Sequence, residues 1–357
     1  MINSVIKGSG RYIPEKVIDN SYFLGYEFYD ENGVRIEKPG EEIIKKFQEI
    51  TEIEERRYVD DQYLNSDIAT FAAQKAIEDA QIDKETIDYI IVAQNFGDID
   101  PVSRQIDMMP SMSSKVKHNL GIKNLKCRPY DMIFGCPGWV EGIILGHQLI
   151  QGGNAKNVLV IGSDTLSRAV DPHDRTAMIF ADGSGAVVLS REEADEKYGV
   201  IAYNTLSYTG EELHYLVNGP SLKSDYVGSN KNIRMKGRKV YEFALRNVPN
   251  ALKETLEDAK VPIDKLSKIL LHQANAKMDH AMIERFYKLY DTPVPETIDP
   301  MTVQKLGNTS VSTIPIMYDL IEKKELGNHE FHKDDYLLFA SVGASMNINS
   351  FVYKYKK

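Results

Sequence analysis

The stretch Asp131-Met-Ile-Phe-Gly-Cys-Pro-Gly-Trp139 lies where an apolar, strand-like run gives way to a helix. Gly135 permits a sharp turn, and Pro137 suits a first helical turn, where its missing N–H costs nothing. Residues 140–150 then carry apolar side chains at helical spacing. Cys136 is therefore predicted at a helix N-terminus, where the helix dipole and free backbone N–H groups lower the pKa of a thiol. The position indicates a nucleophile, although a lone cysteine is also common as a buried structural residue.

Two further polar residues stand at the ends of predicted strands. The string Leu271-His-Gln-Ala-Asn275 follows the apolar run 269–271, so His272 ends a strand. The string Lys305-Leu-Gly-Asn-Thr-Ser310 precedes a helical stretch, which places Asn308 on a turn. Cys, His and Asn in such positions form a nucleophile with two hydrogen-bonding partners. The residues alone leave a second interpretation open, in which each is an ordinary structural side chain.

The composition is that of an ordinary globular chain of 357 residues, with 42% hydrophobic and 27% charged residues. This length favours two domains or two halves. A net charge of −9, from 43 basic and 52 acidic residues, argues against broad nucleic-acid binding. The two cysteines, Cys127 and Cys136, provide no disulfide framework, and no secretory or membrane-spanning run occurs. We therefore expect a cytoplasmic protein that binds neither nucleic acid nor membrane.

The first half alternates continuous apolar strands with helices, which predicts a parallel sheet covered on both faces. The expected strands are 4–9, 89–93, 129–133 and 157–162, and the clearest helix is 66–81. Three stretches lack this regularity, namely 23–58, 96–114 and 207–236.

The second half repeats this order at a spacing of roughly 170–180 residues, which indicates an internal duplication. The corresponding pairs are 268–272 with 89–94, 307–308 with 135–136, 335–340 with 156–161, and 346–355 with 178–189. We expect residues 1–195 to form a half that carries Cys136. Residues 196–357 then form a half that carries His272 and Asn308. The three side chains are expected to meet in a crevice at the strand ends.

Six groups of motifs follow one another along nearly the whole chain. They are Gly8-Ser-Gly-Arg-Tyr-Ile-Pro14, Asp164 with Asp171-Pro-His-Asp-Arg175, Phe180-Ala-Asp-Gly-Ser-Gly185, Met235-Lys-Gly-Arg-Lys-Val240, His272-Gln-Ala-Asn275 and Gly307-Asn-Thr-Ser310. In this order they resemble the β-ketoacyl-acyl-carrier-protein synthase III family of the thiolase superfamily. The resemblance implies an α/β, thiolase-like duplicated fold of two similar halves. Each half is a mixed sheet covered by helices, and together they stack as five layers, αβαβα.

The resemblance also implies an acyltransferase with Cys136, His272 and Asn308 as catalytic residues. Cys136 attacks an acyl thioester, and backbone N–H groups at Cys136 and near Gly343 hold the oxyanion. His272 Nε2 and the Asn308 amide stabilise the enolate that forms when a malonyl thioester loses carbon dioxide. The enolate carbon attacks acyl-Cys136 and gives a β-ketoacyl product, in fatty-acid initiation or a related lipid or polyketide pathway. A thiolase needs a second cysteine in the C-terminal half, and this chain has none there.

Binding partners are implied in the same way. The substrates are thioesters of coenzyme A and of acyl carrier protein, with no metal and no bound cofactor, and the enzyme is a homodimer. The residues expected to bind substrate or coenzyme A are Arg175, Asn275, Gly343 and Ser345. The basic residues expected to dock an acidic carrier protein are Lys236, Arg238, Lys239 and Lys277, with Arg246 close by. A solvated helix face is the alternative interpretation of these charges.

The chain also departs from the family pattern. The cysteine loop is followed by Trp139, and the loop 97–114 is long, which together predict a reshaped acyl pocket. The family's Trp and Arg that clamp the adenine of coenzyme A are absent from 46–50, and Gly343-Ala-Ser345 replaces a triple glycine. Two other functions stay open: an acyltransferase that uses another nucleophile without decarboxylation, and a non-catalytic partner subunit.

Overall fold

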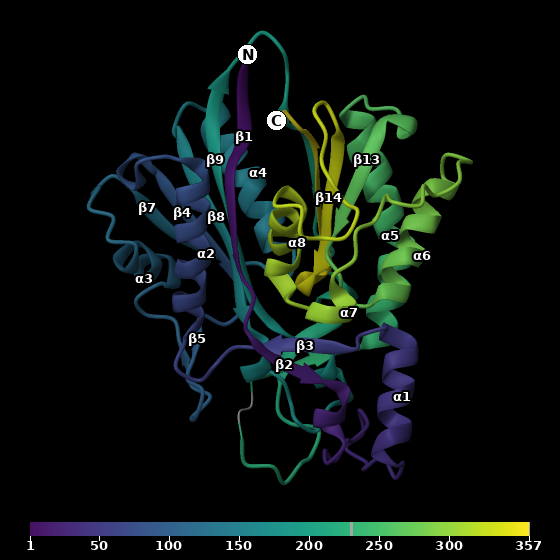
Figure 1. Cartoon of the computed structure of the whole chain (residues 1–357). Coiled ribbons are helices and arrows are strands. Elements are labelled where there is room, and N and C mark those ends of the chain that lie inside the picture. Colours follow the sequence, from purple (N-terminus) through teal and green to yellow (C-terminus); the bar gives the residue numbers. More distant parts are fainter. Residues whose placement is uncertain (229–230, 357) are drawn as a thin grey trace.

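Two sheets stand side by side in the computed structural model, which describes residues 1–228 and 231–356 (Figure 1). The first sheet has the strand order β1-β9-β8-β4-β7, and the second has the order β10-β15-β14-β13. The strands of the first are β1 (Ile2–Tyr12), β4 (Tyr89–Gln94), β7 (Arg128–Ile133), β8 (Asn157–Thr165) and β9 (Asp182–Glu193). Those of the second are β10 (Gly199–Leu206), β13 (Leu266–Leu271), β14 (Tyr336–Gly343) and β15 (Asn347–Lys354).

Four strands of the first sheet, in the order β1-β9-β8-β4, correspond to the second sheet in the order β10-β15-β14-β13, which confirms the expected duplication; β7 is an additional strand of the first sheet. In the first, β8, β4 and β7 are parallel, while β9 is antiparallel to both β8 and β1. In the second, β14 and β13 are parallel, while β15 is antiparallel to both β14 and β10. Each sheet is therefore mixed. Because helices cover both faces of the sheet, most residues of the antiparallel strand β9 are buried, as are those of the parallel strand β4. A run of apolar residues in the sequence therefore does not reveal whether a strand is parallel or antiparallel.

The helices complete five layers. Helices α2 (Asn65–Ala80) and α3 (Met112–Asn119) cover the outer face of the first sheet, and α5 (Gly237–Asp258) and α6 (Ala276–Lys288) cover the outer face of the second. Helices α4 (Gly138–Gln151) and α8 (Thr313–Glu322) lie between the sheets and share one apolar core with both. This αβαβα order confirms the expected architecture (Figure 1).

The layers meet closely because several strand positions are glycine. A Cβ atom on Gly185 of β9 would lie 2.7 Å from Cβ of Pro315 in α8, and one on Gly162 of β8 would lie 2.3 Å from the carbonyl oxygen of Val311. Any side chain at these positions would push α8 and the segment before it away from the first sheet. The same contact continues at Asn308, whose N–H donates to the carbonyl of Ile179 at 2.9 Å. Glycine in the first half thus positions a loop of the second.

The stretches without sequence regularity form shorter elements. Between 16 and 58 lie β2 (Lys16–Asp19), α1 (Gly40–Thr51) and β3 (Glu55–Tyr58), while β5 (Asp98–Ile99) and β6 (Ile106–Asp107) form a small hairpin before α3. The remaining elements with bounds are β11 (Leu216–Gly219), β12 (Asn232–Met235) and α7 (Val303–Leu306). Within residues 1–228 and 231–356, no helix has the length and apolar character needed to cross a membrane.

Candidate active site

Cys136 lies at the entrance to α4, just beyond the carboxyl end of β7. Gly135 makes the turn with φ of +74°, a conformation that favours glycine. Gly343, at the end of β14, lies directly against the cysteine: a Cβ there would be 2.9 Å from Cys136 Cβ and 2.8 Å from Cys136 N. The nucleophile predicted from the first half is therefore packed against backbone of the second half.

Ser310 is the residue that links Cys136, Asn308 and His272. Its hydroxyl donates to Cys136 Sγ at 3.5 Å, and its backbone N–H donates to Asn308 Oδ1 at 2.8 Å. Its backbone also interacts with the His272 ring. His272 follows β13 and is 3% exposed, and Asn308 follows Gly307 and is 4% exposed. The structure therefore gathers all three predicted residues around one serine.

The electrostatics at Cys136 differ from the sequence expectation. The pKa of the thiol is raised to about 11, mainly by burial and to a smaller extent by the Asp164 carboxylate, against the lowering effect of the Ser310 hydroxyl and the Cys136 N–H. The predicted lowering by the helix N-terminus is therefore outweighed by desolvation of the thiolate. In the absence of substrate, Cys136 is a thiol at neutral pH.

His272 is uncharged at neutral pH. Burial lowers the pKa of its ring to about 4, and the Ser310 backbone offsets this only in part. Its Nδ1 atom is buried and has no hydrogen-bond partner within the described residues. A neutral imidazole carries one N–H donor, so His272 is suited to donate a hydrogen bond to a substrate oxygen.

A cavity of about 680 Å³ opens beside Asn308. Its walls are largely apolar and come from α1, the segment after Asp174, and the N-termini of α5 and α6. Of the predicted binding residues it is lined by Arg175 and Asn275, and of the predicted docking residues by Arg238. Two lysines that the sequence analysis did not assign, Lys38 and Lys46, line it as well.

The other predicted binding and docking residues lie around this cavity or outside it. Lys277 lines an adjoining hollow of about 380 Å³, and Lys236 and Lys239 are exposed near the start of α5. Gly343 and Ser345 do not line the cavity; Gly343 lies against Cys136, and Ser345 lies in the turn after β14. Asn275 also caps α6, since its Oδ1 accepts the Met278 N–H at 3.1 Å.

Trp139 does not line this cavity, and the reshaped acyl pocket that the sequence indicates stays a prediction. Its side chain is 1% exposed and packs in the core between the sheets, with its ring 6.3 Å from that of Phe339 and 6.4 Å from that of Phe351. Trp139 lies in the first turn of α4, on the face of the helix that packs against the second sheet, whereas Cys136 lies in the turn before the helix. The altered cysteine loop therefore changes the core rather than the wall of the cavity.

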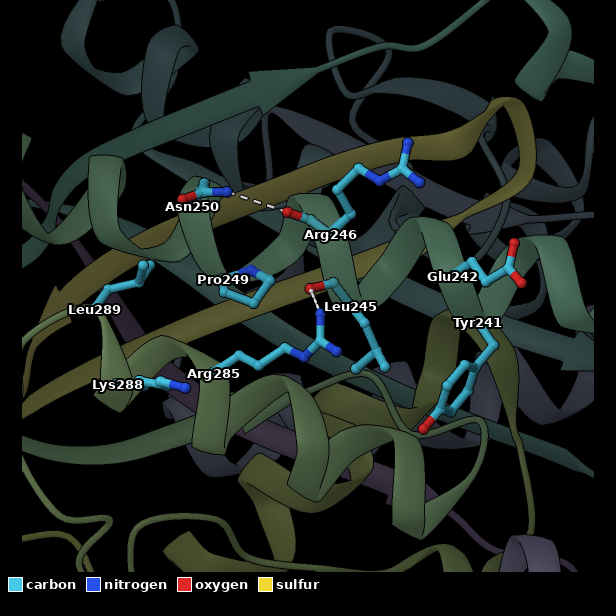
Figure 2. A pocket seen from close by; sticks show the side chains of 9 residues that line it. All are labelled: Tyr241, Glu242, Leu245, Arg246, Pro249, Asn250, Arg285, Lys288 and Leu289. Atoms are coloured by element: carbon cyan, nitrogen blue, oxygen red, sulfur yellow. Dashed lines mark hydrogen bonds between the residues drawn. The ribbon is translucent and has the colours of Figure 1, made fainter.

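A second hollow, of about 820 Å³, lies between α5 and α6 (Figure 2). Pro249 has no N–H, so the Leu245 carbonyl one turn earlier in α5 has no helical donor. Arg285 of α6 supplies one instead, with its guanidinium nitrogen 3.0 Å from that carbonyl. The hollow carries a predominantly positive charge, from Arg246, Arg285 and Lys288 against one acid, Glu242. Tyr241 lines this hollow and the 680 Å³ cavity, so the two adjoin.

Sequence reasoning missed the contacts that surround the nucleophile. Ser310 was identified only as part of a motif, Asp164 only as a point of resemblance, and Asn95 not at all. Asn95 follows β4 as Cys136 follows β7, so the strand-end argument applied to Cys136 would have found it. Within the described residues, no group of three or more His, Cys, Asp and Glu side chains is arranged to hold a metal ion.

Comparison with known proteins gives consistent matches. The family model described as 3-oxoacyl-[acyl-carrier-protein (ACP)] synthase III matches residues 130–208, and the model of its C-terminal part matches residues 256–355. A beta-ketoacyl-[acyl-carrier-protein] synthase III of Staphylococcus aureus (strain JH1) is 32% identical over 358 residues, covering 100% of both chains.

Solved structures match over the same length. The 3-oxoacyl-[acyl-carrier-protein] synthase III of Aquifex aeolicus VF5 has a TM-score of 0.78 at 27% identity, covering 99% of this chain and 100% of that one. The priming β-ketosynthase of the R1128 polyketide pathway has a TM-score of 0.81 at 20% identity, covering 99% of this chain and 97% of that one, and shares the fold.

Proposed function

The chain belongs to the 3-oxoacyl-[acyl-carrier-protein] synthase III family, and from this premise we propose that it joins an acyl thioester to a malonyl thioester with loss of carbon dioxide. The observation that carries the proposal is the contact of Ser310 with Cys136 and Asn308, and its interaction with His272. Cys136, His272 and the turn that carries Asn308 and Ser310 come from three separate parts of the sequence and meet only in the folded chain. A nucleophile and two hydrogen-bonding side chains at one point fit this condensation.

In the first half-reaction, Cys136 Sγ attacks the thioester carbonyl and the carrier thiol leaves. The N–H of Cys136 and the backbone at Gly343 are proposed to hold the oxyanion. Support comes from the closeness of these two backbone segments, since even a Cβ at Gly343 would lie 2.8 Å from Cys136 N. The acyl group then waits on the sulfur.

In the second half-reaction, the malonyl thioester carbonyl is proposed to accept hydrogen bonds from His272 and from the Asn308 amide. Carbon dioxide leaves, the electron pair forms an enolate, and the enolate carbon attacks the acyl carbonyl and releases Cys136. Two features support these roles. The His272 ring is neutral, and the Asn308 amide nitrogen has no partner within the described residues, because the contact to Ser310 uses Oδ1. The Asn308 amide nitrogen is therefore free to donate, and the neutral imidazole retains one N–H donor.

The 680 Å³ cavity is the proposed route of the thioester arm, with Arg175 and Asn275 in its wall. The substrate is proposed to arrive on coenzyme A or on an acidic carrier protein. Lys236, Arg238, Lys239 and Lys277 are the proposed docking residues, and the positive hollow beside them (Figure 2) extends the same surface along α5 and α6. Exposure supports this role, since the Arg238 side chain is 91% exposed.

A homodimer joined through β7 is part of the proposal. This strand is the outer edge of the first sheet, and its Tyr130 and Ile133 side chains are 46% and 58% exposed. An uncovered edge strand with apolar side chains is a surface that proteins normally pair or protect.

The test is intact-protein mass spectrometry after incubation with acyl thioesters of graded chain length on coenzyme A and on carrier protein. We expect one acyl adduct that is absent from Cys136→Ser and that disappears when malonyl thioester is added, as β-ketoacyl product appears. An adduct that persists with malonyl thioester would contradict the condensation, and the absence of any adduct would contradict the role of Cys136.

A further inference from the structure

Asp164 is a buried carboxyl group that the proposed reaction does not use. It lies at the carboxyl end of β8, is 1% exposed and forms no salt bridge within the described residues. Both of its oxygens accept hydrogen bonds from Asn95, which follows the neighbouring parallel strand β4. Burial raises the pKa of the Asp164 carboxyl to about 7, and the Ser310 hydroxyl and the Val311 backbone also interact with it, so this carboxyl competes with Cys136 for the hydroxyl proton. The backbone N–H of Asn95 donates to Oδ1 at 2.9 Å, and its Nδ2 donates to Oδ2 at 2.6 Å. These contacts fix the orientation of the Asn95 amide, so that its NH₂ group, rather than its oxygen, faces the Asp164 carboxylate.

The same NH₂ group reaches the residue that touches the nucleophile. Asn95 Nδ2 also donates to Ser310 Oγ, at 3.0 Å. A serine hydroxyl has one proton, and its oxygen is here accepting, so the proton is available to the sulfur of Cys136, 3.5 Å away. In the chain Asp164, Asn95, Ser310, Cys136, the Asn95 NH₂ group donates to both Asp164 and Ser310, and Ser310 donates onward. The chain ends in a donor to Sγ.

The backbone at Ser310 is held in an unusual conformation for this contact. Its φ is +54°, in the left-handed region that a residue with a side chain seldom adopts. The Asn308 side chain maintains the conformation by accepting the Ser310 N–H. Such local strain persists where surrounding contacts determine it and is common at functional sites. Here the contacts on both sides of Ser310 aim its hydroxyl at the sulfur.

We propose that Asp164 and Asn95 are positioning residues that hold the Ser310 hydroxyl as a hydrogen-bond donor to the Cys136 sulfur. The donor stabilises negative charge on sulfur as the thiol ionises for attack. The carboxylate has a second, opposite effect, because its own charge disfavours a nearby thiolate. Of the two influences on the pKa of Cys136, the Ser310 hydrogen bond is the larger and the Asp164 charge the smaller. The inference rests on the proposed role of Cys136 as the nucleophile.

The substitution Asp164→Asn tests the orientation of Asn95 in the chain. Whichever way the new amide is placed, its NH₂ group meets an N–H donor of Asn95. The Asn95 side chain is then expected to turn over and present its oxygen to Ser310, which draws the hydroxyl proton away from sulfur. Ser310→Ala removes the donor outright and leaves the backbone contacts of residue 310 in place.

The readout is the rate of Cys136 alkylation by iodoacetamide between pH 7 and 9, which follows the thiolate fraction. We expect Ser310→Ala and Asp164→Asn each to slow alkylation about three- to tenfold, since a higher pKa lowers the thiolate fraction but partly raises its reactivity. The double variant is expected to be slower than wild type and slightly faster than Ser310→Ala, since it also loses the charge of Asp164. If Asp164→Asn speeds alkylation both in the wild type and in Ser310→Ala, the proposal is overturned and Asp164 acts through its charge alone. If neither Ser310→Ala nor Asp164→Asn changes the rate, the proposal is overturned and both residues have a purely structural role.

Asp182→Asn is the matched control. Asp182 is also a buried aspartate, 1% exposed, and accepts hydrogen bonds from Ser167 and Val59 rather than from the chain that ends at Cys136. It should leave alkylation unchanged within about twofold even where it lowers the melting temperature. Alkylation needs no acyl thioester, so a failure of the proposed condensation and a failure of the positioning chain give separate results.

Discussion

Ser310 makes three contacts in the site. Its hydroxyl donates to Cys136 Sγ, its N–H donates to Asn308 Oδ1, and its backbone interacts with the His272 ring. The side chain and the backbone thus have separable tasks. A substitution that removes only the hydroxyl should disturb the nucleophile, whereas a change in the backbone at this position should disturb all three predicted residues.

Asn308 likewise has two ends with different partners. Its Oδ1 holds the Ser310 N–H, and its amide nitrogen is the proposed donor to the enolate. Asn308→Asp keeps the acceptor and removes the donor, so we expect condensation to fall at least 100-fold, the usual cost of losing one such donor. Formation of the acyl adduct should stay within about threefold.

Both rates can be measured by mass spectrometry, with Asn308→Ala as the companion variant that also loses the Ser310 contact. Condensation that continues at the wild-type rate in Asn308→Asp would contradict the enolate role. It would favour acyl transfer to another nucleophile without decarboxylation.

His147 predicts a pH dependence of stability away from the site. Burial and the nearby Lys197 lower the pKa of this histidine to about 4. Between about pH 6.5 and 4 the unfolded chain binds a proton there and the folded chain does not, so acid favours unfolding through this residue. Removing the histidine removes that effect.

The comparison is therefore between wild type and His147→Gln, by urea denaturation at a series of pH values. As pH falls from 7 to 4, the difference in free energy of unfolding should move in favour of the variant by about 3 kcal/mol. Parallel curves would show that His147 titrates normally. His118→Gln, at an exposed histidine, should move the difference by less than about 0.5 kcal/mol.

At the scale of elements, α4 joins the site to the core. Cys136 precedes its first turn, and Trp139 in that turn packs on Phe339 of β14 and Phe351 of β15. Trp139→Ala would leave a large cavity between the sheets, and we expect it to lower the free energy of unfolding by about 3–5 kcal/mol. Trp139→Phe should cost less, since it keeps a ring in the same space.

Chemical denaturation measures the cost, and adduct formation with the graded acyl series measures any effect on chain length. Because the indole is 1% exposed and packs on Phe339 and Phe351, Trp139→Phe should keep the wild-type preference. A shifted preference would restore the pocket role that the sequence predicted for Trp139.

The long strands and helices of the fold were predictable from the sequence. The direction of each strand and the short elements between the long ones were not. The apolar runs of β4, β7 and β8 and the helical spacing of α2 and α4 identify these elements within a few residues. Helix α1 was not predicted although it buries Ile43, Phe47 and Thr51 at a spacing of four residues, which is a helical pattern. The two-residue strands β5 and β6 carry too little pattern to detect, and they shorten the stretch that was expected as one long loop.

At the scale of the whole molecule, the site exists only where the two halves meet. The strand-end argument predicted that Cys136, His272 and Asn308 converge, because equivalent turns in a duplicated fold lie at the same edge of their sheets. It could not predict Ser310 as their common partner or the raised pKa of Cys136. Both depend on how deeply the loop 307–312 is packed, which is set by contacts such as those of Gly162 with Val311 and of Gly183 with Thr309 and Ser312.

The proposed dimer gives a whole-molecule prediction. Tyr130→Lys places a charge on the exposed edge of β7, where a paired strand would have to desolvate it. We expect this variant to sediment as a monomer at micromolar concentration, and the wild type as a dimer. Leu125→Lys, at a 97% exposed residue before the strand, is the control and should not change the mass. A wild-type monomer would contradict the dimer itself.

The contact between Ser310 and Cys136 spans 174 residues of sequence, so the ribosome synthesises Cys136 well before Ser310. At a synthesis rate of about 5–20 residues per second, the sulfur emerges about 10–35 s before the hydroxyl that serves it. During that interval the nascent chain carries its cysteine without the donor, the imidazole or the amide. The complete arrangement around the sulfur can therefore form only after residue 310 has been synthesised, and until then Cys136 lacks both the burial that raises its pKa and the groups that assist its reaction.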